Sequence, residues 1–310
     1  MASKRPFKFG AKATKAASGK EWADLARQAE DLGYVSLQID DHFGGQLSPI
    51  PACMAAAAVT SRLQVGTLVA GNDFRNPVVL AKEASTIDLL SDGRFILGIG
   101  AGWLKGDYAI AGIHQDDAHT RIERMGEAID IFRGVWSAEP FSYSGEHYQI
   151  AEVTGYPKPV SDIPILVGGG GRQVLTLAAQ KADIVGINPK IVGRTINPRS
   201  MATAAADVVD EKLSWVREGA GDRYEQIELQ LQVFVTVVTD DPMAVAEKLA
   251  PNFGLPPEVV LAAPYFQIGP LEKIKDDLVE LRDRWDISYI AFQQDATQAV
   301  APLVSQLAGS

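Results

Sequence analysis

The sequence predicts an α/β fold of the (β/α)8 TIM-barrel type. Short, apolar, β-rich segments alternate with helical segments along almost the whole chain. The clearest unit covers residues 66–103, where a strand (VGTLVA), a helix and a second strand (RFILGIGA) follow one another. Both strands are apolar on both faces, which is typical of a parallel sheet covered on either side. The 310 residues suit one domain spanning 1–310, and no linker-like stretch divides them.

Eight such units are predicted in order. The strands are expected at 7–13, 34–40, 63–70, 94–101, 162–171, 183–188, 227–238 and 287–292. The main helices are expected at 18–32, 50–60, 76–90, 119–136, 171–182, 201–219, around 242–261 and 270–284, with a short tail helix after the last strand.

Local signals place several helix ends. Ser18 and Glu21 have the spacing of a capping box. Asn76-Pro77 starts the third helix and Ser91-Asp92-Gly93 ends it, because proline suits the first turn and glycine the position just past the end. The alternation breaks at FSYSGEHYQI (141–150), which predicts a small β-hairpin inside an insertion at about 138–161.

Composition narrows the class of partner. The net charge of −10 argues against nucleic-acid binding, so a small molecule is the expected partner. We expect no membrane span, because no apolar run is long enough, and the N-terminal MASKRPFKFG has no apolar signal-peptide core. The single Cys53 lies in an apolar helix and cannot form an internal disulfide, which indicates a cytoplasmic protein.

The rim formed by the carboxyl ends of the strands is where ligands bind in parallel barrels. Asp40-Asp41-His42-Phe43 follows the second strand directly. A histidine next to a carboxylate suits proton transfer, although Asp41 could equally cap a turn and His42 could merely pack there. Asp107, a few residues after the fourth strand, could add a carboxylate to the same pocket or be an ordinary loop acid.

Two small-residue segments end the third and fourth strands. GTLVAG (66–71) offers backbone and small side chains against a flat ligand. GIGAGW (98–103) lacks the dinucleotide spacing G-x-G-x-x-G, and we expect no helix immediately after it. It therefore predicts a close backbone approach to a ligand face, with Trp103 as a wall.

Gly168-Gly169-Gly170-Gly171 joins a strand directly to a helix, so free backbone N–H groups and the helix dipole converge there, and Arg172 adds a positive charge. This predicts a phosphate site, with a plain tight turn as the alternative. Its position after the fifth strand, rather than the seventh or eighth, suggests a special barrel subtype. In the next loop, Lys190, Arg194 and Arg199 could hold an anionic tail or be solvated charges.

Two further polar patterns have structural interpretations. Glu228, Gln230 and Gln232 alternate with apolar residues, and we expect this polar set to point into the barrel. The cluster of acids and histidines at 114–119 precedes a helix, where aspartate serves as a cap, so we predict no metal site.

Taken together, these motifs resemble the bacterial luciferase-like superfamily and, within it, the oxidoreductases that use coenzyme F420, a deazaflavin. The segments that carry the resemblance are DDHF (40–43), GTLVAGNDFRNP (66–77), TIDLLSDGRFILGIGAGW (86–103), IPILVGGGG (163–171) and WVREGAGDRYEQIEL (215–229). The resemblance implies a luciferase-like TIM barrel with an insertion, and hydride transfer between F420 and a small organic substrate.

The resemblance also implies roles for single residues. Asp41 would contact the deazaflavin ring, and His42 would lie near its redox face as a proton donor or substrate contact. Leu68-Val69 would form a non-proline cis peptide behind the ring. Gly102 and Trp103 would flank the cofactor, and the glycines from Gly168 to Gly171 would hold its phosphate. Dimers are common in the family, and the alanine-rich helix 50–60 could pack against a partner.

Two alternatives remain on the same fold. One is a reduced-FMN monooxygenase, but such enzymes usually carry Glu-His where this chain has Asp41-His42. The other is a non-catalytic flavin-binding protein, against which the retained Asp41-His42 argues. Trp103 stands where the sugar-phosphate dehydrogenases of the family carry a glutamate, so the resemblance does not favour that substrate class.

Overall fold

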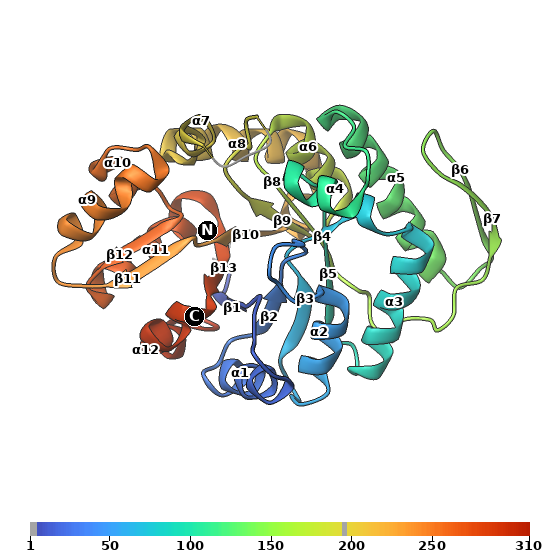
Figure 1. Cartoon of the computed structure of the whole chain (residues 1–310), viewed down its shortest axis with the longest axis horizontal. Helices are drawn as coiled ribbons and strands as arrows, with labels where there is room; N and C mark the ends of the chain where they lie inside the picture. The colour runs from blue at the N-terminus through green and yellow to red at the C-terminus, as the bar shows by residue number, and fades with distance from the viewer. Residues whose placement is uncertain (1–4, 194–196) are drawn as a thin grey trace.

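The computed structural model describes residues 5–193 and 197–310, and its parallel strands close into an eight-stranded TIM barrel surrounded by helices (Figure 1). The sheet closes because β3 pairs with β5, while the first strand pairs with the last. The predicted barrel is confirmed. Its strands are β1 (Lys8–Lys12), β2 (Ser36–Ile39), β3 (Gln64–Thr67), β5 (Phe95–Gly100), β8 (Ile165–Gly169), β9 (Ile184–Ile187), β10 (Glu228–Gln232) and β13 (Ile287–Gln293).

The covering helices begin where capping residues predict. The Ser18 hydroxyl accepts the N–H of Glu21, and the Asn76 side chain accepts the N–H of Val78. The main helices are α1 (Gly19–Asp31), α2 (Pro49–Ala57), α3 (Pro77–Leu90), α5 (Ala118–Trp136), α6 (Arg172–Lys181), α8 (Ala206–Ala220), α9 (Pro242–Phe253), α10 (Pro257–Ala262), α11 (Leu271–Trp285) and α12 (Thr297–Leu307).

Alternate side chains along each barrel strand point either outward, into the core beneath the helices, or inward, into the barrel. On β10, Leu229 and Leu231 belong to the main hydrophobic core, whereas Gln230 is buried and donates to Gln38 Oε1 at 3.0 Å. This contact confirms that the polar set on the seventh barrel strand points inward. A smaller apolar cluster inside the barrel includes Leu166 and Tyr289.

The predicted strand 227–238 is wrong as a single element. It divides into β10 and β11 (Val235–Val238), and β11 leaves the barrel to pair with β12 (Phe266–Gly269), which was not predicted (Figure 1). The division occurs at Val233 and Phe234, whose N–H groups bond the carbonyls of Ala291 and Tyr265 in turn. No glycine or proline marks this change of partner.

Two helical predictions are also corrected. The segment 201–219 is broken at Ala205, whose backbone is extended, into α7 (Pro198–Met201), a turn at Ala202–Ala204 and α8. A short helix, α4 (Lys105–Ala111), follows GIGAGW almost at once and ends at Gly112, where φ is +67°. We had expected a loop there.

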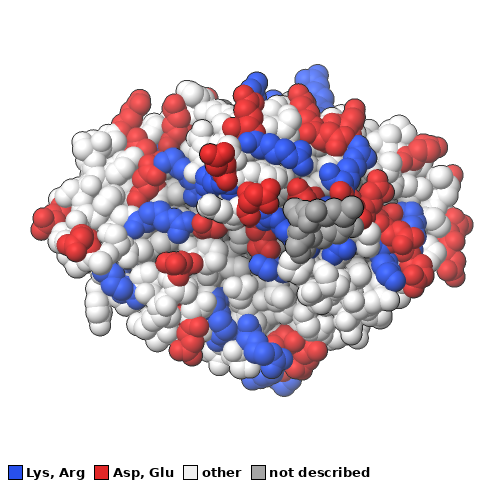
Figure 2. Space-filling view, turned by 180° about the vertical axis from the view of Figure 1, so that it is seen from behind, with Lys and Arg blue, Asp and Glu red and all other residues white. Residues whose placement is uncertain are grey.

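The insertion forms the predicted antiparallel hairpin, β6 (Phe141–Ser144) and β7 (Gln149–Val153), at the edge of the molecule (Figure 1). The Glu127 carboxylate on α5 accepts the N–H groups of Glu146, His147 and Tyr148, which ties the hairpin turn to the helix layer. Among the described residues, every helix is too short or too polar to cross a membrane. On the face seen in Figure 2, acidic and basic side chains are interspersed.

Candidate active site

His42 is hydrogen-bonded to Asp107 across the rim. The distance from His42 Nδ1 to Asp107 Oδ2 is 2.6 Å, and Asp107 Oδ1 accepts the N–H of Phe43 at 3.2 Å. The sequence suggested Asp41-His42 as the pair for proton transfer and Asp107 as a further carboxylate of the same pocket. The structure brings Asp107, on α4, to His42, whereas Asp41 pairs with Arg75. Since a carboxylate can only accept, the bond places the proton on Nδ1 and leaves Nε2 of a neutral ring free to exchange one.

Asp41 has a different task. Its Oδ1 accepts from Arg75 at 3.1 Å, and its Oδ2 accepts from the same guanidinium and from the N–H of Gly71 at 2.9 Å. This bidentate pair fixes the segment after β3 to the end of β2. Sequence reasoning missed Arg75, because a lone arginine in a loop has no diagnostic spacing.

The peptide bond Leu68-Val69 is cis, as the resemblance implied, and separates β3 from the short β4 (Ala70–Gly71). The Val69 side chain lies inside the barrel mouth against glycines of the neighbouring strands. A Cβ at Gly98 would lie 3.1 Å from Val69, and one at Gly100 only 2.5 Å from it. These glycines therefore leave the space that the apolar Val69 side chain fills next to the rim.

Trp103 adjoins His42 at the rim. Their rings meet edge to face, with centroids 5.5 Å apart and planes at 83°. Gly102, just before it, has φ of +73°, and a Cβ there would overlap the Tyr108 hydroxyl. The structure thus places the predicted wall residue beside the predicted proton donor.

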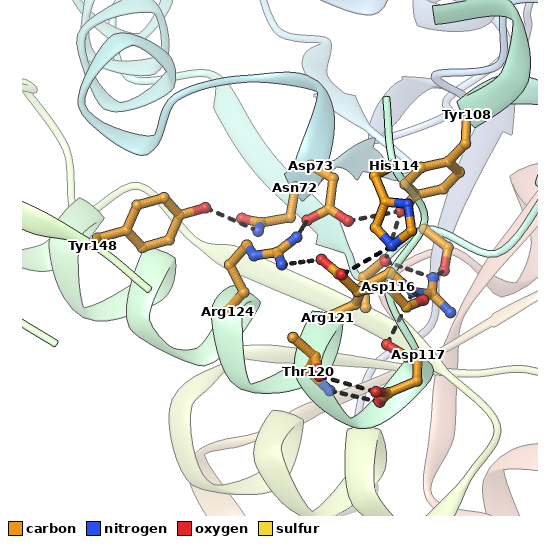
Figure 3. A network of polar contacts seen from close by, with 12 residues as sticks. Asn72, Asp73, Tyr108, His114, Asp116, Asp117, Thr120, Arg121, Arg124 and Tyr148 are labelled. Atoms are coloured by element: carbon orange, nitrogen blue, oxygen red, sulfur yellow. Dashed lines mark hydrogen bonds and ion pairs between the residues drawn. The ribbon is translucent and has the colours of Figure 1, made fainter. Parts of the chain in front are cut away.

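A buried polar network holds α4, and with it Asp107, in place (Figure 3). The Tyr108 hydroxyl donates to Asp73 at 2.9 Å, and burial, with the nearby Asp73 carboxylate, raises the pKa of Tyr108 to about 12. Tyr108 therefore stays protonated at neutral pH. The buried Arg121 donates to the carbonyls of Ala101 and Gly102. The Arg121 bonds hold the loop after β5 against α5, and the Tyr108 bond holds α4 against the turn that follows β4.

The same network extends to the hairpin. Arg124 bridges Asp73 and Asp116, and Asn72 donates to the Tyr148 hydroxyl at 3.3 Å (Figure 3). Asp117 caps α5 by accepting the N–H of Thr120. The described part of the chain contains no group of three or more His, Cys, Asp and Glu side chains arranged to hold a metal ion.

The four glycines of residues 168–171 occupy different positions between β8 and α6. Gly168 and Gly169 end β8, and Gly171 is the N-cap of α6. A Cβ at Gly170 would overlap the carbonyl oxygen of Asn188 and lie 2.5 Å from the nitrogen of Lys190, whereas one at Gly171 would meet only the Lys190 side chain, at 3.8 Å. Gly170 thus permits a backbone crossing, and Gly171 leaves the start of α6 open toward an anion.

The predicted cations lie unequally around this turn. The Arg172 guanidinium pairs with Glu218 on α8 at 3.0 Å, so its charge is already matched. The Lys190 side chain passes over Gly171, and the backbone N–H of Lys190 donates to the Thr203 hydroxyl. Arg199 is exposed on α7, and Arg194 lies outside the described residues. Lys190 is therefore the predicted cation best placed for a phosphate at this turn.

Lys212, on α8, was not predicted as part of the site. It is fully buried, and its ammonium donates to the carbonyls of Asn188 at 2.9 Å and Thr203 at 2.6 Å. It thereby joins the two ends of the loop that crosses the glycine turn. Burial lowers the pKa of Lys212 to about 8. The signal in the sequence was only a lysine on the apolar stripe of a helix.

The pKa of Lys212 predicts how stability depends on pH. Above pH 8 the folded chain releases a proton that the unfolded chain keeps up to about pH 10.5, so the free energy of unfolding rises with pH over this window. We expect wild type to gain roughly 3 kcal/mol relative to Lys212→Met between pH 7 and pH 10.5. Urea unfolding at several pH values measures this difference in the free energy of unfolding. The control is Lys20→Met, because Lys20 is exposed. Parallel curves for wild type and Lys212→Met would contradict the prediction.

The sequence matches the family described as luciferase-like monooxygenase over residues 3–298. An F420-dependent glucose-6-phosphate dehydrogenase of Kineococcus radiotolerans is 36% identical over 189 residues, which are 58% of this chain and 56% of that protein. One from Nakamurella multipartita is 29% identical over 255 residues, covering 78% of this chain and 71% of that protein. The chain thus aligns with little more than half the length of the first of these relatives.

Solved structures have the same fold. An F420-dependent secondary alcohol dehydrogenase in complex with an F420–acetone adduct superposes with a TM-score of 0.77 at 17% identity, covering 98% of each chain. The coenzyme F420-dependent tetrahydromethanopterin reductase of Methanopyrus kandleri gives 0.73 at 19% identity, over 98% of this chain and 99% of that one. The monooxygenase RslO1 of Streptomyces bottropensis gives 0.74 at 19%, over 97% and 98%. Because these identities are low, the superpositions show a shared fold and nothing further about function.

Proposed function

Because this chain belongs to the luciferase-like monooxygenase family, we propose that it is an F420-dependent oxidoreductase that moves a hydride between the deazaflavin and a small organic substrate. The observation that carries the proposal is the His42–Asp107 pair, joined at 2.6 Å on the rim of the barrel. Relatives named as F420-dependent dehydrogenases support the choice of cofactor.

The residues at the rim suit such a cofactor. The open start of α6 at Gly171, with Lys190 over it, would hold a phosphate. Val69 would support one face of a flat ring, and Asp41, Gly102 and Trp103 would border it. When bound, F420 supplies a carbon centre that accepts or donates a hydride.

The protein's own part in the reaction is the proton. Oxidation of an alcohol to a carbonyl releases a proton as well as a hydride, and reduction takes both up. His42 Nε2 would accept or deliver this proton, while Asp107 orients the ring and stabilises its charged form. Trp103, packed edge to face on the imidazole, keeps the ring in one orientation.

Side-by-side titration with oxidised F420 and FMN, followed by fluorescence or calorimetry, tests the cofactor. We expect F420 to bind at least about tenfold more tightly, which corresponds to about 1.4 kcal/mol. Preference for FMN would instead support a reduced-FMN monooxygenase, which needs oxygen and a separate flavin reductase. Binding of neither cofactor would contradict an enzymatic role. Binding of F420 without turnover of any substrate would instead support the non-catalytic flavin-binding protein.

We further propose that the enzyme is a cytoplasmic homodimer and that residues 1–310 act as one domain. Pairing of β1 with β13 supports the single domain, since it joins the two ends of the chain. A groove between α2 and α3 supports the dimer. It is lined by Ile50, Met54 and Leu90, and Leu90 is 62% exposed.

Val79 stands on the same groove and is 52% exposed. Val79→Glu would bring two carboxylates into an interface between copies. We therefore expect the dissociation constant of the dimer to rise at least about tenfold. Light scattering coupled to size exclusion measures the mass against concentration. Ile110→Glu, at a residue 68% exposed on α4, is the matched control and should leave the mass unchanged. A monomeric wild type, or a Val79→Glu variant that stays dimeric, would contradict this interface.

A further inference from the structure

The mouth of the barrel has two unlike walls. On β5, β8 and β9 the inward positions near the rim are glycines, among them Gly98, Gly168 and Gly186. In the closed sheet order, the strands across the barrel from these are β13, β1 and β2. Near the rim, the inward positions there include Lys12, Gln38 and Asp40, so one wall is bare and the other carries groups that can form hydrogen bonds.

The polar wall contains an ion pair with unused capacity. Lys12, at the end of β1, lies 2.8 Å from Asp40 Oδ2, and both side chains are about nine-tenths buried. The other carboxylate oxygen, Asp40 Oδ1, is buried and has no hydrogen-bond partner among the described residues. Gln38 lies two positions before Asp40 on the same face of β2. Its Nε2 is also buried and has no hydrogen-bond partner among the residues that the structure describes. Buried polar atoms are rarely left unpaired.

We propose that Lys12, Gln38 and Asp40 form a polar subsite that binds an uncharged hydroxyl group of the substrate. A hydroxyl can donate to Asp40 Oδ1 while its oxygen accepts from Lys12 or Gln38. Two donors and one acceptor are what such a group needs.

The charge balance selects an uncharged group. The positive charge of Lys12 is already matched by Asp40, so an anion placed here would face the free carboxylate oxygen. Arg75, the nearby cation on the rim, is likewise held by Asp41. The subsite thus favours a neutral, oxygen-bearing substrate over a phosphate ester.

The location agrees with hydride transfer, and in this respect the inference rests on the proposed function. Val69 lies on the glycine side of the mouth and the polar subsite on the opposite side, so a substrate held at the subsite would lie across the mouth from Val69. The polar subsite would anchor one end of that substrate, and His42 would serve the reacting oxygen.

The test is F420 reduction by purified protein with 1,2-cyclohexanediol, glucose and glucose 6-phosphate as probes, each of which carries an oxygen besides the one that would react. We expect turnover of uncharged probes, with KM raised on the order of tenfold to a hundredfold in Lys12→Met and Asp40→Asn, while the Kd for F420 stays near that of wild type. Lys8→Met is the matched control, because Lys8 pairs with Glu228 at 2.9 Å at the opposite end of the same barrel interior. Gln38→Met tests the subsite should Asp40→Asn fail to fold.

Turnover of glucose 6-phosphate alone, or of no uncharged probe, would overturn the inference. So would an unchanged KM in the variants, or a rise in the Kd for F420 that matches the rise in KM, which would place the subsite on the cofactor. Failure of wild type to bind F420 would count against the proposed function itself, so the two failures are separable.

Discussion

His42→Ala is expected to lower kcat by a factor on the order of 10²–10³ while leaving the Kd for F420 close to that of wild type. The reason is the geometry at Nδ1, where Asp107 at 2.6 Å orients the ring so that Nε2 would be free to serve the substrate oxygen in the proposed reaction. Stopped-flow reduction of F420 and fluorescence titration measure the two constants separately. Losing the imidazole removes proton transfer and leaves the ring-binding backbone intact.

Two companion variants and a chemical rescue distinguish chemistry from packing. Asp107→Asn keeps a hydrogen-bonding side chain but removes the carboxylate, so it should lower kcat in the same direction by a smaller factor. His119→Ala, at an exposed histidine on α5, should change neither constant. Added imidazole should restore part of the turnover of His42→Ala, because a cavity left by the ring can admit it. Full activity in His42→Ala would refute the assignment of the proton to His42.

The sequence predicted the barrel well because its signals are local. Alternation of strand and helix, the caps at Ser18 and Asn76, and the turn residues of the hairpin each depend on neighbours in the chain. The same holds for the glycine run, where a strand passes directly into α6. Their roles in binding stay predictions, but their places in the fold follow from spacing alone.

What the sequence could not predict depends on contacts between distant segments. His42 and Asp107 are 65 residues apart and meet through α4, whose N-cap residue, Leu104, has no side chain that could signal the start of a helix. Asp41 therefore seemed the natural partner of His42. Lys212 was likewise not predictable, since a lysine on a helix is ordinarily exposed. Only the fold shows that its ammonium donates to two backbone carbonyls.

Gly170→Ala is expected to weaken F420 binding by at least about tenfold and to lower the free energy of unfolding by about 1–3 kcal/mol. A methyl group there overlaps the Asn188 carbonyl and crowds the Lys190 nitrogen, both of which are backbone atoms. The loop after β9 must therefore move, and Lys190 moves with it away from the start of α6. Fluorescence titration with F420 and urea unfolding measure the two effects.

Gly171→Ala is the matched control one residue along. Its methyl would meet only the flexible Lys190 side chain at 3.8 Å, and Gly171 has φ of −105°, which alanine adopts freely. It should leave the free energy of unfolding near that of wild type, while its methyl group would enter the space proposed for the phosphate and weaken F420 binding. Because both variants add the same single methyl group, a difference in the free energy of unfolding between them measures the crossing of the two loops rather than a change in hydrophobicity. If both variants bind F420 as tightly as wild type does, then the phosphate is held elsewhere and the start of α6 is an ordinary strand-to-helix turn.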